Sequence, residues 1–332
     1  MKILVAGATG AIGRPLLVKL AERGHEVTGM TRSESKRKEI EWLGAESVVA
    51  DALDPEAVAK VVASVDPEVI VHELTSIGPD LDLRNPDKSF GPTNRLRTEA
   101  TDHLLSAARA NGVRRFVAQS FAPLIYERTG SLIKNEDDPV DANPPKGMRQ
   151  TSEAVRYLEK AVTGAEGIEG IVLRYGGFYG LGTSMDPRDG EQLEEIRKRR
   201  FPIVGGGGAV WSFIHVDDGA EATADAVEKG QPGIYNIVDD RPAPVRDWLP
   251  RVAEAIGAKP PRRLPKWLAR LFAGETGVMM MTEMRGSSNT KARRELGWQP
   301  RHPAIWEAIA RERAEVEADA AVRPASRVAA RA

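Results

Sequence analysis

Three glycines near the N-terminus, Gly7, Gly10 and Gly13, have a spacing that suits the binding of a phosphate group. They follow an apolar run, 3–5, that is typical of a buried strand, and they precede 14–23, where leucines recur at helical spacing. In such a strand–turn–helix unit, the glycines permit a tight turn, close approach of a pyrophosphate and close packing of the helix. The helix N-terminus adds free N–H groups and the positive end of a dipole. The predicted dinucleotide-binding residues here are Gly7, Thr9, Gly10, Ala11, Ile12 and Gly13.

The end of the second predicted strand, 25–31, indicates which dinucleotide binds. An acidic residue at this point would hold a ribose 2′-hydroxyl and repel a 2′-phosphate. Here the strand is followed by Arg32, and no acid precedes Glu34. Arg32 could bind a 2′-phosphate through two N–H groups, helped by Lys36 or Arg37. The alternative is that Arg32 is a solvated residue at a helix start. We predict NADP as cofactor, with NAD possible.

Composition excludes several classes of function. The chain has 332 residues, a formal net charge of -1 and no cysteine, so disulfides, thiolate nucleophiles and Cys-based metal sites are ruled out. The balanced charge argues against a nucleic-acid partner, and the five scattered histidines argue against a metal site. With no signal peptide and no apolar run of membrane-spanning length, we predict a cytoplasmic monomer or homodimer that acts on a small molecule away from membranes.

Short apolar strands alternate with amphipathic helices along the first half of the chain. This alternation predicts an α/β fold, a Rossmann-type doubly wound parallel sheet with helices on both faces. Glycine-rich segments then mark a change to a smaller, interleaved α/β C-terminal lobe that would hold the substrate. The predicted division is a dinucleotide-binding domain at 1–175, to which 213–239 returns, a substrate lobe at 176–212 and 240–315, and a flexible tail at 316–332.

Local signals predict several element boundaries. Asp54 before Pro55 predicts an N-cap followed by a helix. Asp217 or Asp218 is expected to cap a helix that continues through Lys229. The remaining segments that matter for the site are a loop at 77–92, one long helix at 93–111, a second loop at 127–148 and a helix at 149–164.

Four motifs occur in a fixed order: the glycine triplet, Leu173-Arg174-Tyr175, Phe213 to Asp218, and Leu296-Gly297-Trp298-x-Pro300. Together they resemble the extended short-chain dehydrogenase/reductase superfamily, in its NAD-dependent epimerase/dehydratase group, over about residues 1–310. The resemblance implies a Rossmann domain, a nicotinamide cofactor, and contact of Tyr175 with the nicotinamide through its backbone. The further positions that it places at the cofactor are Asp51, facing the adenine amino group, with Ala52, Leu74 and Thr75.

The catalytic positions depart from the pattern of this superfamily. Its members normally carry a Tyr-x-x-x-Lys pair, in which the ammonium lowers the pKa of the phenol so that it can exchange a proton with the substrate. None of the five tyrosines here has a lysine four residues later. With the helix anchored on Glu159, the two slots fall on Thr151 and Val155, and the serine slot falls on Ala122.

Other polar residues could supply chemistry near the cofactor. Tyr126 lies just past the fifth predicted strand and is the first candidate for a proton donor. Its alternative is an amphipathic aromatic residue of the loop whose hydroxyl pairs with backbone. Thr151 could orient a substrate oxygen, and Ser120 lies close to the serine slot. The predicted catalytic residues are therefore Tyr126, Thr151 and Ser120.

The predicted substrate lobe lacks one charged group. Sugar-nucleotide members usually carry an arginine two residues before Phe213, and Trp211 occupies that position. Trp211, together with Trp248, Trp267 and Phe272, suggests that the lobe binds an apolar ligand. The alternative is that these residues belong to the hydrophobic core. We predict an NADP-dependent oxidoreductase acting on a non-nucleotide, apolar cyclic or aromatic molecule. The alternatives are a sugar-nucleotide epimerase or dehydratase with rearranged catalytic residues, and a non-catalytic NADP-binding sensor.

Overall fold

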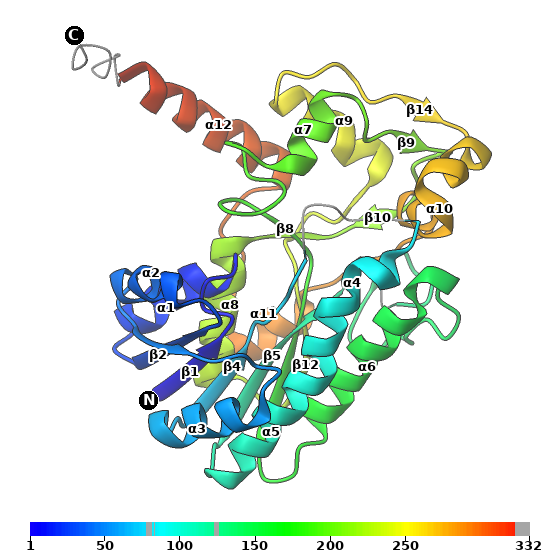
Figure 1. The fold of residues 1–332 in the computed structure, drawn as a ribbon. Helices are drawn as coiled ribbons and strands as arrows, with labels where there is room; N and C mark the ends of the chain where they lie inside the picture. Colours follow the sequence, from blue (N-terminus) through cyan, green and yellow to red (C-terminus); the bar gives the residue numbers. More distant parts are fainter. Residues whose placement is uncertain (78–81, 83, 123–125, 323–332) are drawn as a thin grey trace.

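A computed structural model describes residues 1–77, 82, 84–122 and 126–322 of the chain. Its centre is a seven-stranded parallel sheet in the order β12-β7-β5-β4-β1-β2-β3, which confirms the predicted doubly wound α/β fold (Figure 1). The strands are β1 (Lys2–Ala6), β2 (Glu26–Thr31), β3 (Glu46–Val49), β4 (Val69–His72), β5 (Arg115–Phe121), β7 (Glu169–Tyr175) and β12 (Gly233–Ile237).

Helices cover both faces of this sheet, because each buries an apolar stripe against it. One face carries α1 (Gly13–Glu22), α2 (Arg37–Trp42), with η1 (Glu34–Lys36) before it, α8 (Val216–Lys229) and α11 (Thr290–Leu296). The other carries α3 (Pro55–Val65), α4 (Pro86–Arg95), η2 (Leu96–Ala100), α5 (Thr101–Ala110) and α6 (Arg149–Thr163), preceded by η3 (Lys146–Met148).

A second lobe lies beyond the carboxyl ends of the strands, at the top of Figure 1. It has its own core, in which Trp248 is fully buried against Trp211 and Phe213, whereas Trp267 and Phe272 are exposed. Its elements, with the small strand pairs that join it to the sheet domain, are β6 (Ile133–Lys134), β8 (Gly177–Tyr179), α7 (Glu191–Arg197), β9 (Ile203–Val204), β10 (Val210–Trp211), β11 (Phe213–His215), β13 (Ala243–Pro244), α9 (Val245–Ala255), β14 (Arg263–Leu264), α10 (Lys266–Thr282), β15 (Gly286–Ser287) and α12 (Ile305–Val322).

The structure corrects the segment predicted as a loop at 77–92 followed by one helix at 93–111. Helix α4 already begins at Pro86, where a proline suits the first turn because its fixed φ is helical and its missing N–H has no partner there. The helix is then interrupted by η2, a π-helical turn at Leu96–Ala100, before α5 begins at Thr101. Single π-helical turns of this kind occur often at functional sites.

Other local predictions are confirmed or corrected. Asp54 caps α3 by accepting hydrogen bonds from the N–H groups of the second and third helical residues, as predicted. For α8 the capping side chain is His215, whose Nδ1 accepts from the Asp217 N–H, rather than Asp217 or Asp218. The predicted tail, 316–332, is helical as far as Val322, and the rest of it lies outside the described residues.

Candidate functional site

A partly open pocket with a cavity volume of about 370 Å³ lies at the carboxyl ends of β1, β2 and β4. Parallel α/β sheets bind ligands at this edge. The sequence-predicted residues that line it are Gly7, Thr9, Gly10, Arg32, Asp51, Ala52, Leu74 and Thr75. The lining residues that sequence reasoning missed are Met30, Thr31, Ser33, Ala50, Glu73, Ser76 and Leu96, and Lys36 was named there only as a helper.

The glycine turn is built so that no side chain fits in it. Gly7 has a φ of +96°, and a Cβ there would lie 2.6 Å from the Glu73 carbonyl carbon. A Cβ on Gly13 would lie 2.2 Å from the Gly7 carbonyl oxygen, so α1 can approach β1 only with glycine at this position. The Gly10 N–H donates to the same oxygen at 3.0 Å. The backbone therefore leaves a bare, N–H-lined edge that fits a dinucleotide phosphate.

Four predicted cofactor residues lie outside the lining of this pocket. Gly13 and Ile12 are buried beneath the turn, Ile12 beside Gly219, and Ala11 faces a different groove on α1. Tyr175 is fully buried, with its hydroxyl donating to Glu73 Oε1 at 3.1 Å and 2.5 Å from Thr223 Oγ1. The predicted backbone contact of Tyr175 with the nicotinamide stays a prediction.

The basic side chains near the rim of the pocket differ in whether they already form an ion pair. Arg32 is exposed and makes no hydrogen bond or ion pair with the residues that the structure describes. Lys36 pairs with Glu39 at 2.8 Å, and Arg37 pairs with Glu34 at 3.2 Å. Arg32 is therefore the guanidinium at this rim that can bind an anion without breaking an existing pair.

Glu73 is the unexpected group in the pocket. It follows β4 directly and is 4% exposed, and its Oε2 has no hydrogen-bond partner among the described residues. Burial raises the pKa of this carboxyl to about 8, although the hydrogen bond from Tyr175 opposes the shift. In the sequence, Glu73 is an acid two residues after the apolar run 69–71, a position where an acid is normally solvated, so its burial has no local signal.

A second, much smaller pocket has a cavity volume of about 20 Å³ and is lined by Arg97 of η2, whereas the preceding residue, Leu96, lines the first pocket. Thr151 reaches it from α6, where its hydroxyl donates to Asp87 Oδ1 at 2.8 Å and accepts from Asn94 Nδ2 at 3.1 Å. The full lining is Phe90, Arg97, Phe121, Met148, Thr151, Ser152 and Val155.

Ser120 and Tyr126 belong to one buried ionic network instead. Ser120 donates to Glu159 Oε1 at 2.7 Å, and Arg174 binds both oxygens of Glu159, at 2.8 and 2.7 Å. Arg174 also donates to the Tyr126 hydroxyl at 2.9 Å, which in turn donates to Asn236 Oδ1 at 2.7 Å. Burial raises the pKa of Tyr126 to about 12, even though Arg174 opposes the shift. The hydroxyl protons of both residues are thus already donated to protein acceptors.

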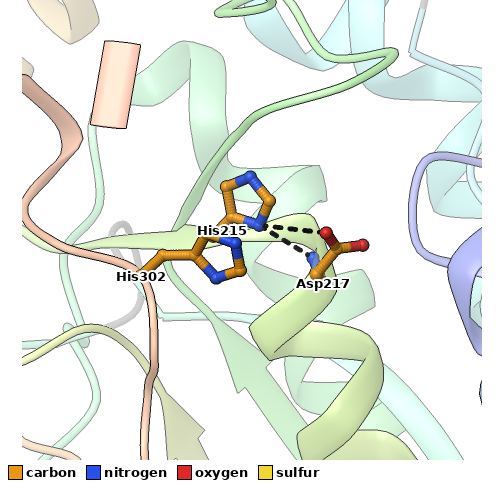
Figure 2. Close-up of side chains that lie close together, drawn as sticks. All are labelled: His215, Asp217 and His302. Atoms are coloured by element: carbon orange, nitrogen blue, oxygen red, sulfur yellow. Dashed lines mark hydrogen bonds and ion pairs between the residues drawn. The ribbon is translucent and has the colours of Figure 1, made fainter. Parts of the chain in front are cut away.

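One group among the described residues has the composition of a metal site: His215, Asp217 and His302 (Figure 2). The two imidazoles stack, with centroids 3.6 Å apart and an angle of 12° between the rings. A shared cation must lie close to the plane of both rings, which parallel stacked rings do not allow. His215 Nδ1 already accepts the Asp217 N–H. This geometry suits a structural junction better than a metal centre, and the predicted absence of a metal stays a prediction.

Comparison with known proteins adds the family. The family model described as "NAD dependent epimerase/dehydratase family" matches residues 3–238. The chain belongs to this family. It is also 44% identical over 314 residues, 94% of this chain and 100% of the relative, to a "3-diazoavenalumate denitrifying reductase" from a Streptomyces species. A ketoreductase of Stigmatella aurantiaca that acts on a farnesyl dihydroquinoline oxide is 28% identical, over 78% of this chain and 74% of the relative.

Among solved structures, the UDP-glucose 4-epimerase of Thermotoga maritima with UDP-glucose superimposes with a TM-score of 0.74, covering 96% of this chain and 100% of that one. At 22% identity this likeness shows the shared fold alone. The family and the reductase relatives make the chain an NAD(P)-dependent oxidoreductase of the extended short-chain dehydrogenase/reductase superfamily. No helix of the described residues is both long enough and apolar enough to span a membrane. Localisation and oligomeric state stay predictions.

Proposed function

We propose that this protein is an NADPH-dependent reductase that removes a diazo group, as N₂, from a small aromatic compound. The observation that carries the proposal is the likeness to the Streptomyces denitrifying reductase, because it spans the full length of that enzyme at 44% identity. The other reductase relatives are 28% identical or less. The unpaired Arg32 at the rim of the pocket supports NADPH over NADH.

The chemistry of this reaction suits the catalytic positions of the chain. A bound reduced nicotinamide supplies a hydride, and its transfer to the terminal nitrogen of an aryl diazonium gives a neutral aryl diazene. The diazene then loses its N–H proton and N₂, and the ring carbon takes up a proton in their place. Overall, ArN₂⁺ and a hydride yield ArH and N₂. No carbonyl oxygen gains charge, and the reaction therefore needs no Tyr-x-x-x-Lys pair to protonate one.

The predicted catalytic residues take positioning roles in this proposal. Thr151 borders the smaller pocket and holds Asn94 in place. Ser120 and Tyr126 hold Glu159 and Asn236, and so tie β5 to α6 and the loop at Tyr126 to β12. Hydride transfer then depends mainly on how the substrate is positioned against the cofactor.

The test supplies an aryl diazonium salt labelled with ¹⁵N and NADPH to the purified protein. We expect one ¹⁵N₂, measured by mass spectrometry, for each NADPH oxidised, and a slower oxidation when the transferred hydrogen of NADPH is deuterium. The Tyr126→Phe variant should keep most of this turnover, because its hydroxyl supplies no proton to the substrate. If Tyr126→Phe folds normally but loses turnover, Tyr126 is the proton donor instead.

Two other results would replace the proposal. Conversion of UDP-glucose to UDP-galactose would favour an epimerase, since two relatives at 26% and 27% identity are UDP-glucose 4-epimerases. Tight NADPH binding without oxidation by diazo, ketone or quinone substrates would favour a cofactor sensor. The control is the same set of assays with the Gly10→Ala variant, whose added methyl group stands where the cofactor pyrophosphate approaches.

A further inference from the structure

Arg97 is a buried cation with no counter-ion among the described residues. It is 7% exposed, and its guanidinium makes a long hydrogen bond, 3.4 Å from Nη1 to Asn94 Oδ1. No carboxylate lies within ion-pair distance of it among the residues that the structure describes. Burial lowers the pKa of Arg97 to about 10, with Glu159 opposing the shift, so the guanidinium is charged at neutral pH.

The acidic groups near Arg97 already bind other residues. Glu159 uses both oxygens to bind Arg174 and also accepts from Ser120. Asp87 accepts from the backbone and the hydroxyl of Thr151. The region therefore holds two buried guanidinium groups and one buried carboxylate that pairs with Arg174. A buried charge with no partner costs several kcal/mol in a folded protein, and a ligand anion would remove that cost.

The fold places this cation on the wall of a small, partly open pocket. The π-helical turn places Arg97 on the wall of the smaller pocket, and Thr101 fixes the turn by donating to the Arg97 carbonyl at 2.9 Å. Asn94 orients the guanidinium and is itself held by Thr151. The rest of the lining is mostly apolar, with the rings of Phe90 and Phe121.

We propose that Arg97 is the anion subsite of the substrate pocket and binds the carboxylate of an aromatic acid. A guanidinium and a carboxylate match in a planar, two-point pair, and the apolar lining suits a ring. The inference rests on the proposed function, since it names the substrate of that same site as a diazo-substituted aryl carboxylate. With the carboxylate end at Arg97, the diazo end would point toward the cofactor pocket, which the neighbouring residue Leu96 lines.

The test uses two unreactive probes of equal shape, cinnamate and cinnamamide, whose affinities are measured by isothermal titration calorimetry with NADP⁺ present. We expect wild type to bind cinnamate at least tenfold more tightly than cinnamamide. The Arg97→Gln variant should lose that preference and bind the amide as wild type does, and Arg97→Lys should keep part of it. The control is Arg95→Gln, two residues away, where an exposed arginine pairs with Glu99 at 2.7 Å.

The folded state and the proposed reaction are checked separately. Replacing a buried, unpaired charge with an amide is expected to leave the melting temperature and the affinity for NADP⁺ unchanged or to raise the melting temperature. Equal binding of cinnamate by wild type and Arg97→Gln overturns the subsite, even if diazo compounds are reduced. Loss of the preference in Arg97→Gln supports the subsite even if no diazo compound is reduced, in which case the proposed reaction alone fails.

Discussion

At the scale of one residue, the proposed preference for NADPH over NADH depends on Arg32. The guanidinium is unpaired among the described residues and borders the pocket beside Ser33. Replacing Arg32 with alanine is expected to weaken NADPH binding by about 10- to 100-fold, the usual value of hydrogen bonds to a charged group. Binding of NADH, which lacks the 2′-phosphate, should change by less than about threefold by the same reasoning.

Titration of both cofactors into both proteins, followed by the fluorescence of the reduced nicotinamide, measures this difference. Arg37→Ala is the matched control, because that guanidinium already pairs with Glu34 and binds Ser47 at 3.0 Å. Equal losses for the two cofactors in Arg32→Ala would contradict the phosphate role.

Single residues divide clearly into those that the sequence could predict and those that it could not. Gly10 and Gly13 were predictable because their constraint is local, since a Cβ on either would meet the Gly7 carbonyl oxygen of the same short turn, and Gly7 was predictable because the turn needs its positive φ. Arg97 and Glu73 were not, because an arginine on a helix and an acid after a strand are normally solvated. Their importance comes from burial, which depends on residues far away in the sequence.

The β1–α1 unit permits a prediction that separates binding from folding. A Cβ on Gly10 would lie 3.2 Å from the Gly7 carbonyl oxygen, whereas on Gly13 it would lie 2.2 Å from that oxygen and 2.7 Å from the Ala8 carbonyl. We expect Gly10→Ala to melt within a few degrees of wild type, but to lose cofactor affinity because its methyl group stands where the pyrophosphate approaches. We expect Gly13→Ala to be strongly destabilised, since α1 must move away from β1.

Thermal melting with and without NADPH measures both effects. The cofactor is expected to raise the melting temperature of wild type, and in Gly10→Ala it should no longer do so. The control is Gly24→Ala, where nothing lies within 4 Å of the new Cβ, although the φ of +78° makes a small loss of stability expected. A Gly10→Ala protein that binds NADPH normally would show that the pyrophosphate does not use this turn.

Elements were predicted well where one chain segment determines them. The strands of the sheet and helices such as α6 follow from apolar periodicity, which acts over neighbouring residues. The π-helical turn η2 carries no such signal, because it preserves helical periodicity on either side. The pairing of β6 with β15 joins segments about 150 residues apart, and each strand has only two residues. The predicted loop at 127–148 therefore missed β6.

The stacked histidines matter for the whole molecule, because they join the sheet domain to the C-terminal segment. Asp218, at the start of α8, accepts the backbone N–H groups of Arg301 and His302 at 3.0 and 2.9 Å. Its own carbonyl accepts from the Trp298 indole at 3.1 Å, and His215 Nε2 lies 3.3 Å from Glu312 of α12. The motifs noted in the sequence at 213–218 and 296–300 are therefore two sides of one structural contact.

Three buried groups determine how the stability of the whole molecule depends on pH. Burial raises the pKa of Glu73 from 4.5 to about 8 and that of Asp239 from 3.8 to about 7, and it lowers the pKa of His72 from 6.5 to about 4. At the two carboxyl groups the folded protein therefore binds more protons than the unfolded chain. This proton binding stabilises the folded state, and the stabilisation is lost as pH rises through 7 and 8. His72 acts in the opposite sense, since protonation of the unfolded chain below pH 6.5 favours unfolding.

Between pH 6.5 and 8 the carboxyl effect is no longer offset by His72, so we expect the free energy of unfolding to fall with rising pH. Each group contributes at most about 1.4 kcal/mol per pH unit, and only Glu73 continues to contribute between pH 7 and 8. Urea unfolding at half-unit pH steps, without cofactor, measures this slope. Glu73→Gln, whose amide mimics the protonated carboxyl, should flatten it between pH 7 and 8, while the exposed Glu46→Gln should not. Parallel curves for wild type and Glu73→Gln would mean that Glu73 is ionised in the folded protein, and the buried acid beneath the cofactor pocket would then carry a full negative charge.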